Sequence, residues 1–194
     1  MQDLTTKNFG LLIAYVLPGF TLLWGASHHS ITLQTWLGQT SSDLPTVGGF
    51  LYVTLGSVAA GMTASTVRWL LIDTLHHWTG LRQPAWDFSQ LADRVLAFDT
   101  LIEIHYRFYQ WHANMIVALL SCFMLRWTAV GINAEEVTTV ILLCGLFFIG
   151  SRDTLRKYYA RVAGVLGTND VYGSGVEPTP ENALTAEKIT PIQR

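Results

Sequence analysis

Histidine is the residue type in this chain whose chemistry most needs an explanation, because it can bind metals, ligate haem or titrate near neutral pH. The six histidines fall into separate groups at positions 28–29, 76–77, 105 and 112. On one helix His105 and His112 would lie about 10 Å apart along the axis, too far for both to bind one ion. No HxxxH, HxxHH or HExxH motif is present. We therefore expect no metal site and no cofactor.

Other catalytic groupings are also missing from the sequence. It contains no glycine-rich phosphate-binding loop and no GxSxG motif. The carboxylates between residues 73 and 103 stand singly, at positions typical of helix caps and exposed helix faces. Cys122 and Cys144 lie within apolar runs and lack the spacing of a zinc site or a disulfide framework. These patterns predict that the protein is not an enzyme.

Polar side chains interrupt a long apolar pattern in the middle of the chain. Apolar or aromatic residues recur at alternating spacings of three and four from Phe88 to Phe123, and His105, Tyr109 and His112 occupy three of these positions. Polar groups at membrane depth are costly and turn toward protein or water. Three interpretations remain open: a hydrogen-bonded belt at the inner interface, a conduction path or gate in an oligomer, and a pocket for a lipid headgroup or small ligand. The candidate pore or belt residues are His105, Tyr109, His112, Arg107 and Asn114.

The helices that carry these residues are expected to lie in a lipid bilayer. Half of the 194 residues are hydrophobic and 13% are charged, against about 25% charged residues in an average soluble domain. A soluble protein of this length cannot cover its surface with so few charges. The net charge is −2 and no basic block occurs, so we expect no nucleic acid partner.

Four apolar segments suit membrane spans, at residues 9–26, 47–72, 108–127 and 137–151. A cleaved signal peptide is the alternative for the first segment, because small residues follow it at 25–27. Its length and its internal proline favour a span instead. Nine Lys and Arg residues near the span ends fall on one side of the membrane and one falls on the other. This asymmetry predicts a protein of the bacterial inner membrane with both termini in the cytoplasm.

The expected fold is an all-α membrane protein with four transmembrane helices. The three-and-four pattern predicts one helix of about forty residues, from Asp87 to Trp127. Its first half is expected to leave the membrane and pair with the extension of the second span, which forms a cytoplasmic antiparallel hairpin over residues 73–107. Residues 1–165 would form the membrane domain, and residues 166–194 have the composition of a disordered cytoplasmic tail.

Two further surfaces are predicted from residue types. Small residues in the second span suit close helix packing, inside the subunit or across an oligomer interface; they are Gly56, Ala60, Ala64, Ser57 and Gly61. A basic continuation of the fourth helix over residues 152–165 suits anionic lipid or a partner; its cations are Arg152, Arg156, Lys157 and Arg161.

The overall pattern resembles that of small four-span bacterial membrane proteins with a cytoplasmic helical extension. Some of those proteins serve as channel-like effectors or as membrane-anchored subunits in antiviral defence. The resemblance is one of architecture and carries over no residue. It implies an oligomeric pore-forming or membrane-perturbing effector, such as an ion channel. The alternative is a membrane anchor or sensor that docks a soluble cytoplasmic protein through the hairpin and the basic helix.

Overall fold

The computed structural model describes residue 10, residues 12–39 and residues 47–167, and in these ranges the chain is helical with no strand. Residues 168–194 of the predicted tail and residues 40–46 of the loop before the second span lie outside the described residues, whereas Leu166, the first residue of the predicted tail, is helical. The elements in order are η1 (Leu12–Val16), α2 (Leu17–Ser27), α3 (Ile31–Trp36), α4 (Val47–Arg68), η2 (Trp69–Asp73), α5 (Thr74–Trp78), η3 (Phe88–Gln90), α6 (Leu91–Leu101), η4 (Ile102–Tyr106), α7 (Arg107–Val130) and α8 (Ala134–Leu166).

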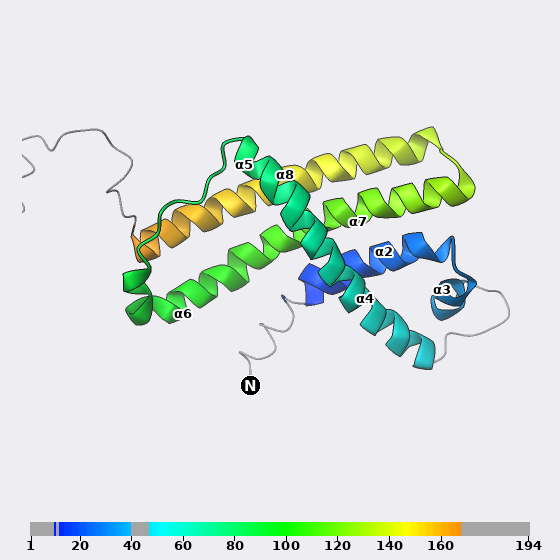
Figure 1. Ribbon diagram of the computed structural model, residues 1–194, viewed down its shortest axis with the longest axis horizontal. Coiled ribbons are helices and arrows are strands. Elements are labelled where there is room, and N and C mark those ends of the chain that lie inside the picture. Colours follow the sequence, from blue (N-terminus) through cyan, green and yellow to red (C-terminus); the bar gives the residue numbers. More distant parts are fainter. Residues whose placement is uncertain (1–9, 11, 40–46, 168–194) are drawn as a thin grey trace, which may run out of the picture.

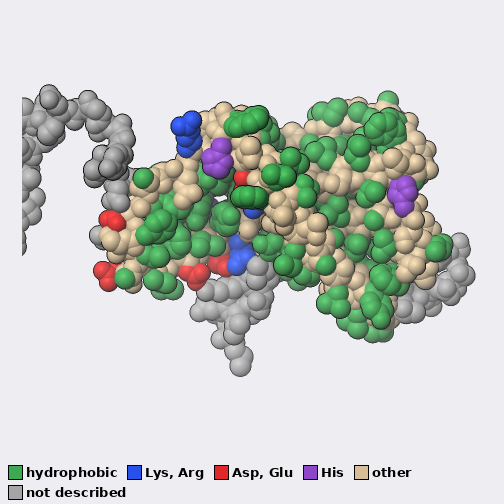
Figure 2. Space-filling model, in the orientation of Figure 1, with side chains coloured by type: hydrophobic (Ala, Val, Ile, Leu, Met, Phe, Trp, Pro, Cys, Tyr) green, Lys and Arg blue, Asp and Glu red, His purple; other side chains and the backbone are tan. Residues whose placement is uncertain are grey.

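Three continuous helices are long and apolar enough to cross a membrane. They run over Val47–Trp78, Leu91–Val130 and Ala134–Leu166, and a shorter apolar helix covers Leu12–Ser27. Figure 2 shows hydrophobic side chains over the half of the molecule that holds α2, α4 and α7, whereas charged side chains gather toward α6 and the end of α8. The all-helical class is therefore confirmed, and three of the helices suit a membrane protein; the count of four spans stays a prediction.

Helix α7 has one parallel neighbour and one antiparallel neighbour. Contacts from Tyr15 to Gln110 and from His29 to Leu125 show that η1–α2 and α7 run in parallel. Helix α8 runs antiparallel to α7, and α4–η2–α5 crosses both obliquely (Figure 1). The connection between α7 and α8 begins at Gly131, whose φ of +96° suits glycine at a helix end. Asn133 then caps α8, because its side chain accepts a hydrogen bond from the Glu135 N–H.

The predicted long helix forms with a kink at Arg94, whose φ of −126° and ψ of 16° are not helical, but the predicted hairpin does not form. The extension of α4 does not pair along α6; instead α6 and η4 pack along the second half of α8. Gly80 ends the preceding helix with a φ of +88°, and Pro84 cannot continue one. Residues 81–87 therefore run extended beside α8, where the Asp87 N–H donates to the Gly167 carbonyl oxygen at 3.3 Å. Because α6 starts at the far end of α8, it lies out of reach of α5.

Helix α4 packs its small-residue face against η1–α2. Ser57, Gly61 and Ala64 are buried on this face. A Cβ at Gly61 would clash with the Tyr15 carbonyl oxygen, and a Cβ at Gly56 would lie 3.2 Å from Leu23. Ala60, the remaining residue of the predicted face, is half-buried. In the described chain this face therefore meets a helix of the same subunit.

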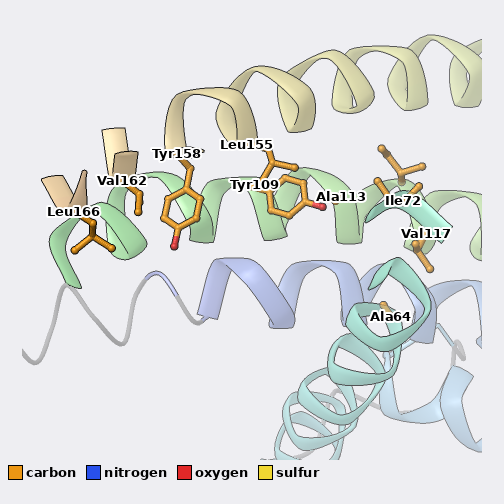
Figure 3. Close-up of a cluster of buried hydrophobic side chains, with 10 residues drawn as sticks. Ala64, Ile72, Tyr109, Ala113, Val117, Leu155, Tyr158, Val162 and Leu166 are labelled. Atoms are coloured by element: carbon orange, nitrogen blue, oxygen red, sulfur yellow. The ribbon is translucent and has the colours of Figure 1, made fainter. Parts of the chain in front are cut away.

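The hydrophobic core lies where α6–α7 and α8 face each other. Leu155, Tyr158, Val162 and Leu166 follow one face of α8 at spacings of three and four, and Figure 3 shows them pointing toward the opposing helix. Tyr109 belongs to the same cluster. The apolar seam read from the sequence therefore serves the contact with α8.

Candidate functional site

A group of polar side chains is buried where α4–η2–α5 crosses α7 and α8. Arg68 is 4% exposed, and its Nη2 lies 3.8 Å from Asp73 Oδ2. The Tyr109 hydroxyl donates a hydrogen bond to Asp73 Oδ1, and the Arg68 guanidinium lies 5.2 Å from the centre of the Tyr109 ring. Among the described residues, Arg68 Nε and Nη1 have no hydrogen-bond acceptor. The cation is thus compensated by one carboxylate and one ring face.

His76 is the second buried ionisable group, with 1% of its side chain exposed. Its Nε2 lies 3.0 Å from Ser151 Oγ, and its ring stacks on Phe148 at 5.1 Å between centroids. Ser151 Oγ–H already donates to the Phe148 carbonyl oxygen at 2.9 Å. Nε2 of a neutral His76 must then be the donor, which assigns the tautomer and leaves Nδ1 as an acceptor. Nδ1 is buried and has no partner among the described residues.

A cavity of about 310 Å³ adjoins both groups. Its wall comes from three places in the sequence: residues 69–86 with η2, α5 and the extended connection, residues 106–109 of η4 and α7, and the second half of α8. The surface drawn in Figure 2 is hollowed beside α5, between that helix and the α6–α8 pair. The lining residues are Trp69, Asp73, His76, His77, Leu81, Gln83, Trp86, Tyr106, Tyr109, Leu155, Tyr158 and Tyr159.

Aromatic rings form a connected wall along this cavity. Trp86 meets Tyr158 and Tyr159 with 5.9 Å between centroids in each pair. Tyr106 continues the row, at 5.2 Å from Tyr158 and 5.8 Å from Tyr109. The indole Nε1–H of Trp86 is buried without a partner among the described residues. The cavity therefore combines aromatic faces, one carboxylate, one unused acceptor and one unused donor.

Two π-helical turns position the polar lining. Trp69–Asp73 forms one turn and Ile102–Tyr106 forms the other. A π turn brings residues i and i+5 together, which is the spacing of Arg68 and Asp73. Such turns are frequent at functional sites, because they redirect side chains within a continuous helix.

The predicted belt residues separate in the structure, and Tyr109 alone among them lines the cavity. His105 contacts Arg161 on α8, and His112 Nδ1 lies 2.6 Å from the Phe108 carbonyl oxygen. Arg107 forms an ion pair with Glu103 at 2.8 Å. The buried Asn114 donates to the Ala14 carbonyl oxygen at 2.9 Å.

His105 lies beyond the apolar segment at 108–127. Partial burial lowers its pKa below the usual 6.5, and the charges of Arg161 and Lys157 lower the pKa further. This histidine is therefore neutral at physiological pH.

The predicted basic surface is partly engaged within the chain. Arg152 donates to the Thr79 carbonyl oxygen at 2.9 Å, and Lys157 pairs with Asp153 at 2.6 Å. Arg161 contacts His105, whereas Arg156 is exposed. Arg152 thereby fastens the end of α5 to α8, next to the cavity.

Sequence reasoning missed Arg68, Asp73, His76 and Trp86. Arg68 carried a usable signal, because it is the single charged residue within the apolar segment 47–72 and such residues mark functional sites. The other three could not be found from spacing, since the crossing of α5 over α7 and α8 brings them together.

Another cavity in the structure has a different chemical character. This cavity of about 830 Å³ lies between η1 and α4, and its largely apolar lining suits a lipid chain. Within the described ranges, no three His, Cys, Asp or Glu side chains lie close enough to hold a metal ion together.

Comparison with family models, curated proteins and solved structures gives no match for this chain. Its function is therefore inferred from the cavity and the residues around it.

Proposed function

We propose that the chain is a four-span protein of the bacterial inner membrane with both termini in the cytoplasm. The parallel course of α2 and α7, with α8 antiparallel, supports this topology because successive spans must alternate in direction. In this arrangement α6 and the second half of α8 extend into the cytoplasm. Reporter fusions at residues 35, 85, 131 and 170 should read outside, inside, outside and inside. A cytoplasmic signal at residue 35 would contradict the topology.

Within this topology the protein acts as a membrane anchor and sensor, which binds a small ligand and docks a soluble cytoplasmic partner. The observation that carries the proposal is the 310 Å³ cavity, whose wall is shared by α5, α7 and α8. A ligand that contacts three helices can favour one of their arrangements over another. The change would reach the cytoplasmic ends of α6 and α8, where a partner would dock.

Ligand-linked thermal stabilisation tests the proposal. The full chain in nanodiscs is heated with lipid and small-molecule fractions of a bacterial extract. A bound ligand raises the unfolding midpoint. At least one fraction should raise the unfolding midpoint of the wild type. It should also raise the midpoint of the control Trp78→Leu, because Trp78 is 84% exposed and lies outside the cavity. Trp86→Leu should lose the rise. No stabilisation of folded wild-type protein by any fraction would contradict a ligand-binding role.

An oligomeric pore or membrane-perturbing effector is the second candidate. The observation that favours it is the group of Arg68, Tyr109 and His76, which are buried, and Asp73, which is partly buried, because ionisable groups at membrane depth often mark ion or proton paths. The contacts of His105 and His112 with their own subunit favour the sensor. Ion flux into liposomes between pH 5.5 and 8 separates the two, since the sensor predicts none and a pore predicts flux altered by His105→Leu/His112→Leu. A role in antiviral defence stays a prediction.

A further inference from the structure

Resting on the proposed sensor function, we infer that the cavity binds an organic ammonium group with an oxygen acceptor a few bonds away. Phosphoethanolamine and phosphocholine have this chemistry, either as lipid headgroups or as free compounds. The inference follows from four features of the cavity: its aromatic wall, its acceptors, its unused donor and its route of access.

The aromatic wall suits a cation better than a neutral polar group. Trp86, Tyr106, Tyr158 and Tyr159 line a cavity small enough for one ammonium to lie near several rings. Each ring face attracts a cation within about 6 Å of its centroid, and quaternary ammonium groups are bound in such aromatic cages.

The acceptors of the cavity have capacity left for a cation. Asp73 Oδ1 accepts from the Tyr109 hydroxyl, but Asp73 Oδ2 is 3.8 Å from Arg68 Nη2, which is longer than a hydrogen bond. His76 Nδ1 adds a buried acceptor without a partner among the described residues. A protonated primary amine, as in phosphoethanolamine, can donate hydrogen bonds to such acceptors, whereas a quaternary ammonium has no N–H and is attracted by the carboxylate charge and the ring faces alone.

Positive charges near the cavity do not line it. The Arg68 guanidinium is buried behind the Tyr109 ring. The Arg152 guanidinium is held by Thr79. Neither side chain contributes to the cavity wall, so the charged group that a ligand meets there is the Asp73 carboxylate.

The unpaired Trp86 N–H indicates which group the rest of the ligand carries. The Trp86 Nε1–H is buried and unpaired among the described residues, and it can only donate. An ammonium cannot satisfy it, whereas the phosphate or hydroxyl oxygen that follows an ammonium in these headgroups can. Trp86 therefore offers a ring face and a hydrogen bond to two parts of one ligand.

Access from the apolar side favours a lipid as the source. A second hollow of about 210 Å³ shares Trp69, Asp73 and His77 with the cavity and includes Leu70, which is exposed on the apolar surface. A headgroup could thus enter the cavity while its chains stay beside α4.

Binding to the full chain in nanodiscs of phosphatidylglycerol tests the inference. The probes are short-chain phosphatidylethanolamine, free phosphocholine, tetramethylammonium and, as the anionic control, short-chain phosphatidylglycerol. Native mass spectrometry and the unfolding midpoint report binding. Trp86→Leu should weaken ammonium binding about tenfold, the size expected for one desolvated cation–π contact, and Trp78→Leu should leave it unchanged. Trp86→Phe should weaken phosphocholine but not tetramethylammonium, because it keeps a ring and loses the donor.

The outcomes separate the ligand class from the function. Binding of the ethanolamine lipid supports a headgroup source, and binding of free phosphocholine with equal dependence on Trp86 supports a soluble source. Equal binding of phosphatidylglycerol, or no binding of any ammonium by folded protein, would overturn the inference. A bacterial extract fraction that still stabilises the wild type but not Trp86→Leu would leave the sensor function standing with another ligand. If no fraction does so, both proposals fail.

Discussion

The ion pair of Arg68 and Asp73 lies within the α4–η2 helix, where Arg68 is buried and Asp73 is partly buried. Two charges taken out of water must compensate each other, and losing one leaves the other buried without a counter-charge. Tyr109 supports the pair from α7 through its hydroxyl and its ring face. The crossing point of the helices is therefore held by polar as well as apolar contacts.

Neutralising Asp73 is expected to destabilise the protein strongly. Asp73→Asn should lower the free energy of unfolding by about 3 kcal/mol, because Arg68 then stays buried without its carboxylate. The double variant Arg68→Met/Asp73→Asn should recover much of the loss. Asp153→Asn is the control, since its ion pair with Lys157 is exposed. Denaturant unfolding in micelles is the measurement, and equal stability of Asp73→Asn and Asp153→Asn would contradict the role of the pair.

The environment of His105 predicts a pH dependence of stability. Burial, then Arg161 and Lys157, lower its pKa below 6.5 in the folded chain, so the unfolded chain binds a proton more readily. The contribution of neutral His105 to the free energy of unfolding is therefore present above pH 6.5 and is lost as the pH falls below that value. Unfolding midpoints between pH 5 and 8 should decline less steeply on acidification in His105→Gln than in the wild type. Identical slopes would show that this histidine does not matter.

The helices themselves show which features a sequence can reveal. The three-and-four apolar pattern correctly predicts the helix that ends near Val130, because periodicity reports a buried face. It could not tell which helix covers that face, and α8 rather than the extension of α4 does so. Likewise, small residues at positions 56–64 indicate a packing face without naming α2 as its partner. The cavity could not be predicted at all, because three distant segments build it.

A charge placed at the contact between α6 and α8 tests the corrected pairing. Phe98 packs against the core cluster on the α8 side, whereas Leu96 on the same helix is 81% exposed. Phe98→Asp should cost about 2 kcal/mol or more, because its charge loses water without gaining a partner. Leu96→Asp should be tolerated. Urea unfolding of both variants is the comparison, and equal effects would contradict the packing of α6 on α8.

The close approach of α4 to η1 makes a similarly direct prediction. Gly61→Ala would bring a methyl group onto the Tyr15 carbonyl oxygen, so the two helices must separate. A loss of about 1–3 kcal/mol is expected, as for other overpacked sites. Gly145→Ala is the matched control, because nothing lies within 4 Å of its added Cβ. In thermal unfolding, Gly61→Ala should lower the midpoint more than Gly145→Ala does. An unchanged midpoint in Gly61→Ala would contradict the close approach of α4 to η1.

The molecule as a whole divides into an apolar part and a charged part that share one helix pair. Helices α7 and α8 continue from the apolar segments 108–127 and 137–151 into α6 and the basic residues after 151. The cavity lies at this transition, where Trp86 and the tyrosines from α8 meet the end of the α4–α5 helix. In the proposed topology, a ligand bound there would couple events at the membrane surface to α6 and the second half of α8.

Hydrogen–deuterium exchange measures this coupling most directly. The full chain in nanodiscs is compared with and without the extract fraction that stabilises it, using Trp86→Leu as the variant that cannot respond. The sensor account predicts slower exchange in both 91–107 and 152–166 for the wild type, because the cavity wall joins these segments. Protection confined to residues 69–86, or equal protection in Trp86→Leu, would contradict it.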